Sequence, residues 1–275
     1  MRKASLRNNL VLIKMGGSVV TFKDRPESAN YSAIEGVARA ISLLQEIPMI
    51  MVHGGGSFGH YWSVRYNMHT RPSSYDTHGI SIVHESMIKL NQIIVNSLIK
   101  NGLNPYTISV FALTSGNKPL TPKINQIHTI AQTGLVPVTF GDIIHISDGN
   151  YSILSGDVIM TMIAEILKPS KVIFAVNTDG VYSDIKSRKT IRELNKANIT
   201  DSRSVRFAAT SHTIADITGG MCRKVKEGFK IASRGLDVMI VNGLKPEKIT
   251  QAVRSGPEDF EGTVIRGRSD RLKKG

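Results

Sequence analysis

The chain has 275 residues, of which 41% are hydrophobic and 21% charged, so it is long enough to bury a full core without a metal or a disulfide. Its formal net charge is +13, but the basic residues of the two ends supply about half of that charge. Since only 6% of the residues are aromatic, the composition argues against a protein that stacks single-stranded nucleic acid.

The composition also bears on compartment and membrane association. Cys222 is the only cysteine and cannot form an internal disulfide. No run approaches the ~20 apolar residues that span a bilayer, and the first apolar run, Leu10 to Ile13, is too short for a secretory signal. We expect a cytoplasmic protein that associates with neither membranes nor nucleic acid.

Short apolar runs alternate with helical patterns along most of the chain. Apolar residues recur at helical spacing over residues 34–44 and again over residues 83–98. The runs that predict strands cover residues 10–13, 49–52, 106–111, 136–140, 171–176, 237–241 and 262–265. This alternation predicts an α/β fold whose mostly parallel central sheet is buried under helices on both faces.

The middle of the chain departs from this alternation. Two apolar runs flank Asp148-Gly149, which predicts a β-hairpin, and a helix follows from Asp157. We place a boundary near Lys168-Pro169-Ser170, with residues 1–168 and 169–275 forming two lobes of one continuous sheet.

Two glycine-rich turns follow predicted strands. One is His53-Gly54-Gly55-Gly56-Ser57-Phe58-Gly59-His60, and the other is Lys14-Met15-Gly16-Gly17-Ser18. Glycines let the backbone approach an anion closely and direct several N–H groups at it, and His53 and His60 would add donors. Two such turns suggest one phosphate donor and one phosphate acceptor.

Other interpretations of these turns stay open. Gly54 to Gly59 fits the Gly-x-Gly-x-x-Gly pattern of nicotinamide enzymes, although the polar stretch from Tyr66 to Asp76 lacks the acidic strand end that pattern requires. Each turn could also be purely structural. A Walker-type site is excluded, because no glycine in the chain is followed by lysine.

Three further polar segments complete the pattern. Ser155-Gly156-Asp157 opens a predicted helix, Asn177 to Tyr182 follows a predicted strand, and Thr218 to Lys224 opens another helix. From its position alone, Asp157 could simply be a helix N-cap. Several polar turns at strand ends of an α/β sheet nevertheless indicate a crevice in which ligands bind.

The order and spacing of these five motifs resemble the amino acid kinase superfamily and, within it, the isopentenyl phosphate kinases. The resemblance implies an open αβα sandwich, usually a homodimer, that uses ATP and Mg2+ to convert isopentenyl phosphate to isopentenyl diphosphate in the mevalonate pathway of isoprene biosynthesis. The resemblance to the isopentenyl phosphate kinases, as distinct from the superfamily as a whole, rests on Ser57 to His60 and on Thr77-His78-Gly79.

The resemblance also implies roles for individual residues. Lys14 and Lys224 would neutralise the transferring phosphoryl group, Asp157 would orient them, Lys23 would lie nearby and His60 would bind the acceptor. The nucleotide would contact Lys14, Gly16, Gly17, Ser18, Gly56, Thr178, Asp179, Tyr182, Gly219, Gly220 and Lys224. The acceptor phosphate would contact Gly54, Gly55, Gly59, His60 and Gly156. No metal ligand is assigned.

Alternatives remain within and outside the superfamily. Fosfomycin kinase shares the glycine-rich loop and its histidine, uridylate kinase is a more distant candidate, and a non-catalytic anion-binding regulator is also conceivable. The apolar stripe Val83, Met87, Leu90 and Ile94 could form a wall for an isoprenoid tail or belong to the core.

Overall fold

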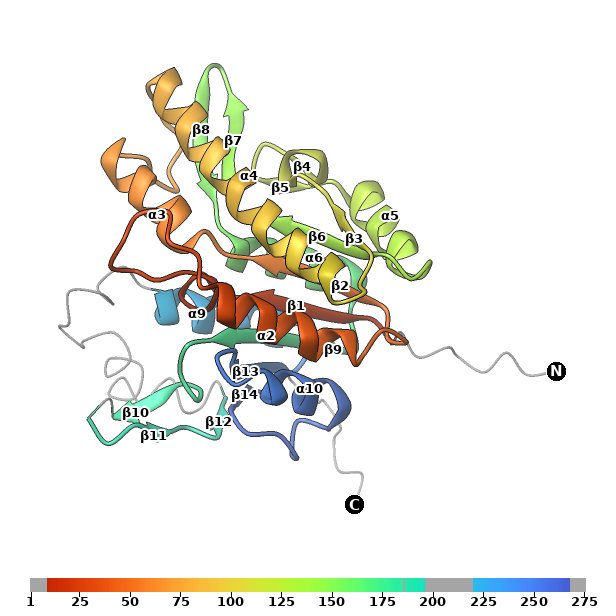
Figure 1. The fold of residues 1–275 in the computed structure, drawn as a ribbon. Helices are drawn as coiled ribbons and strands as arrows, with labels where there is room; N and C mark the ends of the chain where they lie inside the picture. Colours follow the sequence, from red (N-terminus) through yellow and green to blue (C-terminus); the bar gives the residue numbers. More distant parts are fainter. Residues whose placement is uncertain (1–8, 185, 196–219, 268–275) are drawn as a thin grey trace.

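The computed structural model describes residues 9–184, 186–195 and 220–267, and its main sheet has eight strands in the order β12-β14-β13-β9-β1-β2-β6-β3 (Figure 1). Neighbouring strands in this sheet run parallel, except that β13 and β14 are antiparallel. The strands are β1 (Val11–Met15), β2 (Met49–His53), β3 (Pro105–Thr107), β6 (Val136–Phe140), β9 (Lys171–Val176), β12 (Glu193–Leu194), β13 (Val238–Asn242) and β14 (Thr263–Ile265). The predicted α/β fold with a mostly parallel sheet is confirmed.

Helices cover both faces of the sheet and give the fold three layers (Figure 1). One face packs against α1 (Gly17–Val20), α2 (Tyr31–Ser42), α3 (Gly56–Arg65), α4 (Thr77–Lys100) and α10 (Pro246–Arg254). The other face packs against α5 (Thr121–Ala131), α6 (Gly156–Leu167) and α9 (Gly220–Ala232). Because side chains alternate along a strand, Ile13 enters the first core and Leu12 the second. Lys14 therefore points toward the face of α6 and α9.

One predicted strand is wrong in its second half. The run over residues 106–111 forms only β3, and a 3-10 helix, η1 (Val110–Leu113), follows it. Ser109 caps η1 by accepting a hydrogen bond from the backbone N–H of Phe111, and Phe111 is 65% exposed. Apolar character alone does not distinguish a buried strand from a short capped turn.

The predicted hairpin is confirmed and stands beyond the main sheet, beside the amino-terminal half of α4 (Figure 1). It consists of β7 (Asp142–Ser147) and β8 (Asn150–Leu154), and both turn residues, Asp148 and Gly149, have positive φ angles. The small pairs β4 (Thr114–Ser115) with β5 (Lys118–Pro119), and β10 (Tyr182–Asp184) with β11 (Lys189–Thr190), complete the described strands.

The sheet continues without interruption across residue 168. β9 follows this position in the chain, yet it pairs with β1 on one side and β13 on the other. The two lobes of our sequence-based division thus share the centre of one sheet.

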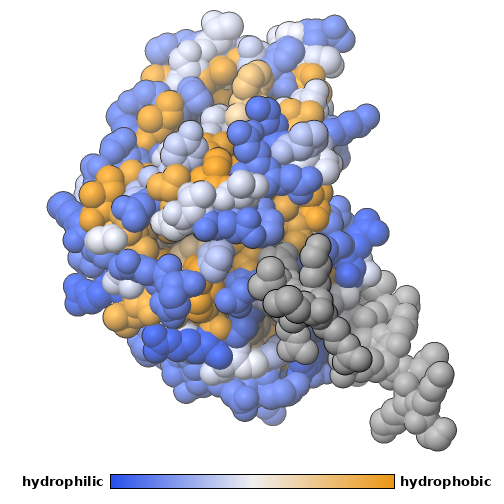
Figure 2. Space-filling view, turned by 90° about the vertical axis from the view of Figure 1, so that its right-hand side faces the viewer, coloured by the Kyte–Doolittle hydropathy of each residue, from blue (hydrophilic) through white to orange (hydrophobic). Residues whose placement is uncertain are grey.

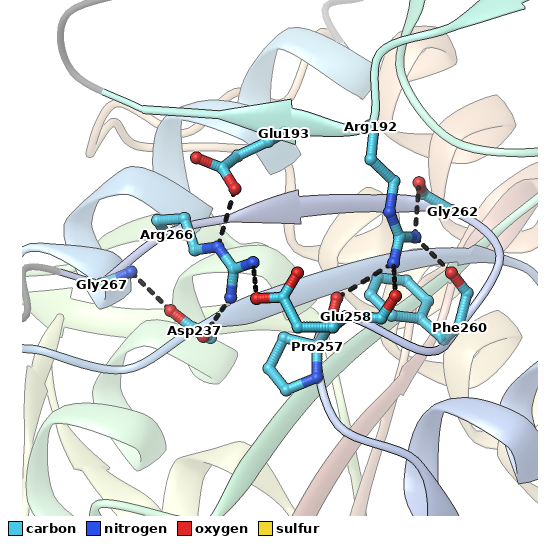
Figure 3. Close-up of polar contacts among 9 residues, drawn as sticks. All are labelled: Arg192, Glu193, Asp237, Pro257, Glu258, Phe260, Gly262, Arg266 and Gly267. Atoms are coloured by element: carbon cyan, nitrogen blue, oxygen red, sulfur yellow. Dashed lines mark hydrogen bonds and ion pairs between the residues drawn. The ribbon is translucent and has the colours of Figure 1, made fainter.

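Arg266 anchors the outer edge of the sheet (Figure 3). Its guanidinium pairs with Glu193 at 2.9 Å, with Asp237 at 3.1 Å and with Glu258. Arg192 lies over the ring of Phe260 at 4.6 Å and donates to backbone carbonyls of residues 257–262. Arg266, one of the basic residues near the end of the chain, is thus held in place by three carboxylates.

No helix within the described ranges is long and apolar enough to cross a membrane. Figure 2, which views the molecule from the right-hand side of Figure 1, shows apolar residues in small groups separated by polar ones.

Candidate active site

Three polar turns begin side by side where β1, β2 and β9 end. Met15 pairs in register with His53 on one side and with Ala175 on the other, so the chain leaves all three parallel strands at the same level. The amino terminus of α6 reaches the same place, because a Cβ on Gly156 would lie 2.9 Å from Lys14 Cε and 3.1 Å from the carbonyl oxygen of His53. Ligands of α/β proteins bind at such carboxyl edges.

Asp157 lies between two lysines from different elements. Lys14 Nζ donates to Asp157 Oδ1 at 2.5 Å, and Lys224 Nζ lies 3.9 Å from Oδ2. Lys14 is 3% exposed and Asp157 5%. The N-cap of α6 is Ser155, whose hydroxyl accepts from the N–H of Val158, so the interpretation of Asp157 as an N-cap is wrong.

The electrostatics of this trio favour an anionic ligand. Burial pushes the pKa of Asp157 up, but attraction to Lys14 and Lys224 outweighs burial and leaves this pKa below its usual value. Burial, reinforced by repulsion from Lys14, lowers the pKa of Lys224 to about 8, although Asp157 opposes that shift. The ammonium groups of the buried Lys14 and the largely covered Lys224 share one carboxylate, and a phosphate can neutralise the remaining positive charge.

The two glycine-rich turns touch each other through their backbones. A Cβ on Gly17 would lie 2.4 Å from the nitrogen of Gly56, and a Cβ on Gly54 would lie 2.8 Å from the nitrogen of Gly17. Gly56 also has a φ of +48°, which favours glycine. The predicted donor and acceptor turns are therefore direct neighbours.

Two glycines in these turns use their backbone N–H groups within the protein. The N–H of Gly16 donates to the carbonyl of Ala175, and the N–H of Gly54 donates to that of Met15, both at 2.9 Å. Since each N–H is used within the protein, the expectation that Gly16 presents its N–H to a phosphate is wrong. Gly16 and Gly54 instead allow the strands and turns to pack closely.

His60 lies on α3 at the surface, next to other cations. Burial, followed by repulsion from Lys23 and Arg223, lowers the pKa of His60 below its ordinary value. An anion bound beside His60 would act against burial and against these two cations, and would raise this pKa. Lys23 and Arg223 thus place positive charge beside a histidine that favours its neutral form.

The other histidine of the turn has a different role. His53 is 1% exposed and stacks on Phe140 with ring centroids 5.0 Å apart. Its ring nitrogens contact the Gly54 carbonyl at 3.2 Å and Asn91 Oδ1 at 3.3 Å. Burial lowers the pKa of His53 to about 4, so it is neutral and buried. The expectation that His53 offers a donor to phosphate is wrong.

Three of the expected nucleotide residues, Thr178, Asp179 and Tyr182, follow β9 in the chain, and they already have partners. Asp179 Oδ1 accepts from Asn242 and from Lys245, both at 2.8 Å, and the N–H of Asp179 donates to the Tyr182 hydroxyl at 3.2 Å. The Thr178 hydroxyl donates to the carbonyl two residues later. Our sequence analysis missed Asn242 and Lys245, although a polar residue at the end of the neighbouring strand β13 was a usable signal.

Two of the remaining predicted residues, Ser18 and Gly220, also make contacts within the protein. Ser18 donates from its hydroxyl to Asn177 Oδ1 at 3.0 Å and so joins the turn after β1 to the turn after β9. Gly220 begins α9, and its carbonyl accepts from Lys224 Nζ at 3.1 Å. Gly219 lies outside the described residues.

A second group that the sequence did not reveal holds the segment carrying Lys23. Glu27 has a φ of +46°, accepts from the indole of Trp62 at 2.5 Å and lies 3.7 Å from Lys89. The Thr21 hydroxyl accepts from the N–H of Ser57 at 2.9 Å. These contacts tie the loop between α1 and α2 to α3 and α4.

The apolar stripe of α4 divides between two environments. Leu90 and Ile94 belong to the core under the sheet, as ordinary packing predicts. Val83 packs with the hairpin residue Ile143, and the sulfur of Met87 lies against Gly55 and Gly59 of the acceptor turn. Val83 and Met87, 1% and 2% exposed, are thus the buried part of the stripe that lies nearest to the glycine turn.

Within the described residues, no three His, Cys, Asp or Glu side chains are grouped as a metal site. Both carboxylate oxygens of Asp157 face lysines, and one oxygen of Asp179 is shared by two donors. The side chains described here do not form a dedicated cage for a divalent cation.

Comparison with known proteins agrees with this geometry. The model of the amino acid kinase family matches residues 9–242. The chain belongs to the amino acid kinase family. The resemblance inferred from the five motifs is thereby confirmed, and membership favours a kinase over a nicotinamide enzyme.

Within this family, the chain is similar to several proteins named isopentenyl phosphate kinase. The isopentenyl phosphate kinase of Thermoplasma acidophilum is 33% identical, with 94% of this chain and 100% of the relative covered. The isopentenyl phosphate kinase of Arabidopsis thaliana is 30% identical, with 79% and 72% covered. The crystal structure of the T. acidophilum enzyme in a product complex superposes with a TM-score of 0.74 at 30% identity, covering 94% and 100%.

Proposed function

We propose that this chain transfers a phosphoryl group from ATP to isopentenyl phosphate, producing isopentenyl diphosphate and ADP. The observation that carries the proposal is Asp157 held between Lys14 and Lys224, directly beside the paired glycine turns. The named relatives at about 30% identity support the choice of acceptor.

The chemistry suits these residues. A phosphate oxygen of isopentenyl phosphate attacks the γ-phosphorus, a new P–O bond forms, and the bond to the bridging oxygen of ADP breaks. The attacking oxygen is already ionised, so no general base is required, and catalysis depends on positioning and charge neutralisation. Lys14 and Lys224 neutralise the transferring group, and Asp157 keeps both ammonium groups aimed at it.

The acceptor phosphate binds at Gly54, Gly55 and Gly59 of the glycine-rich turn and at Gly156, with His60 as a donor and Lys23 nearby. Its apolar tail then lies toward Met87 and Val83 of α4.

We further propose that residues 1–168 mainly bind the acceptor and residues 169–275 the nucleotide. Mg2+ enters as part of MgATP, bound mainly by phosphate oxygens and water. A homodimer and a cytoplasmic location complete the proposal and rest on the resemblance and on the single cysteine.

The test is ADP release with MgATP and four acceptors in parallel: isopentenyl phosphate, fosfomycin, N-acetylglutamate and uridylate, with products identified by phosphorus NMR. A diphosphate formed from isopentenyl phosphate alone supports the proposal. Turnover confined to another acceptor reassigns the substrate, and silence with all four refutes kinase activity toward these acceptors. Lys14→Ala should lower turnover by orders of magnitude while the fold persists, and near-normal turnover would refute the lysine pair.

A further inference from the structure

Polar contacts join α6 to α9 at three successive levels. On α6 the contacting residues are Asp157, Thr161 and Glu165, which are spaced four residues apart and so lie on one face of the helix. Opposite them are Lys224 and Glu227, which lie within α9, and Arg234, which lies just beyond its end. The first level is the proposed active-site pair of Asp157 and Lys224. The third level is a surface ion pair, in which Arg234 Nε lies 3.0 Å from Glu165 Oε1.

The second level is buried. The Thr161 hydroxyl donates to Glu227 Oε2 at 2.7 Å, and Thr161 and Glu227 are only 7% and 4% exposed. The other oxygen, Oε1, accepts from Lys230, whose side chain is half exposed, also at 2.7 Å. Rotation or sliding of α9 would break this contact and leave the buried carboxylate of Glu227 without one of its donors. Because such a loss is costly, the contact resists both movements.

We propose that the Thr161–Glu227 contact fixes the rotation and height of α9 against α6 and thereby places Lys224 beside Asp157. The inference rests on the proposed role of Lys224 in phosphoryl transfer. Thr161 and Glu227 are positioning residues, since they act through Lys224.

The geometry explains why so small a contact matters. A shift of α9 by one residue would turn Lys224 by about 100° and move it ~1.5 Å along the helix axis. Lys224 lies only three residues before Glu227 on the same helix, so a change at Glu227 is transmitted directly to the ammonium group. Misplacement of a catalytic group by ~1 Å can lower a rate by about 100-fold.

The charges that face Lys224 define a second readout. Lys14 from β1, Asp157 from α6, Lys23 from the loop after α1, and Arg223 from α9 itself act on its titration, together with burial. If α9 moves away from α6, Lys224 gains solvent and loses repulsion from Lys14. Its titration midpoint should then rise toward the ordinary lysine value of ~10.4.

The experiment compares Thr161→Val with Thr161→Ser and Arg234→Gln. Valine keeps the shape of threonine but removes the hydroxyl, serine keeps the hydroxyl, and Arg234→Gln breaks only the exposed level of the same helix pair. Steady-state kinetics give kcat and both KM values. NMR of lysine-labelled protein, with the signal assigned by Lys224→Arg, gives the Lys224 titration without any substrate.

We expect Thr161→Val to lower kcat by ~10- to 100-fold with little change in either KM, and to raise the Lys224 midpoint. Thr161→Ser and Arg234→Gln should match the wild type in both readouts. If the valine variant does not fold, Thr161→Ala replaces it, because the smaller side chain leaves room for a water that can pair with Glu227. The direct contact between the two helices is still lost, so this variant must show the same loss of kcat.

Wild-type kcat and an unchanged Lys224 midpoint in a folded Thr161→Val or Thr161→Ala protein would overturn the inference. An equal loss in Arg234→Gln would overturn it too, because general packing of the two helices would then be the cause. If the wild-type chain phosphorylates none of the four acceptors, the proposed function fails, while the NMR titration still tests the contact itself.

Discussion

Replacing Asp157 by asparagine would remove the only carboxylate described between Lys14 and Lys224 while keeping the shape of the side chain. The two N···O separations are 2.5 and 3.9 Å. At an effective dielectric constant of ~20 these correspond to gross attractions of about 7 and 4 kcal/mol. The cost of burying the three charges offsets much of this attraction, so the stability loss is smaller than the sum.

Breaking a buried pair from one side leaves an uncompensated charge, and such changes typically cost ~3–5 kcal/mol. We expect Asp157→Asn to lose stability in this range and to depress the pKa of Lys224 further below about 8, because Asp157 is what opposes burial and Lys14 there. ATP or ADP should restore part of the stability, since their phosphates supply the missing negative charge.

The kinetic signature separates this role from simple structural damage. We expect kcat to fall by ~100- to 1000-fold because the ammonium groups lose their orientation, while KM for ATP is unchanged or lower because the site becomes more positive. Urea denaturation and steady-state kinetics measure the two effects.

Asp76→Asn is the matched control. Asp76 is the N-cap of α4 and accepts from the N–H of Gly79, and asparagine caps helices about as well as aspartate. If Asp157→Asn behaved like this control, with near-normal kcat and little loss of stability, the reasoning about the lysine pair would be refuted.

Three predictions concern pH. Because the pKa of Lys224 is about 8, kcat/KM for ATP should decline above pH ~8, and in an active Lys224→Arg variant this decline should move to higher pH. His53 has a pKa of about 4 in the folded state against ~6.5 in the unfolded state, so its contribution of ~3 kcal/mol to the free energy of unfolding is present above pH 6.5 and lost as the pH falls toward 4. The free energy of unfolding of His53→Gln should therefore depend less steeply on pH in this range. An unchanged dependence would contradict burial as the cause of the shift. Acceptor binding should raise the pKa of His60, so calorimetry near pH 6 should detect proton uptake that His60→Asn reduces, and equal uptake in that variant would assign the proton elsewhere.

Much of the fold followed from local sequence. The strands over residues 136–140 and 171–176 were predicted with the observed bounds, because each is a short apolar run buried on both faces. The hairpin followed from Asp148-Gly149, whose backbone conformation local chemistry favours. The second half of the strand predicted over residues 106–111 failed, because a side-chain cap at Ser109 competes with strand pairing.

The sequence by itself determined that glycine-rich and polar turns follow the strands, since the backbone chemistry of those turns is local. Only the tertiary structure decided which side chains meet. Lys14 and Asp157 are 143 positions apart and come together because β1 directs Lys14 toward the face that α6 covers. The same packing sends His53 into the core and leaves His60 at the surface, although both flank one glycine turn. Burial and long-range contacts depend on how the layers pack, and no local pattern contains that information.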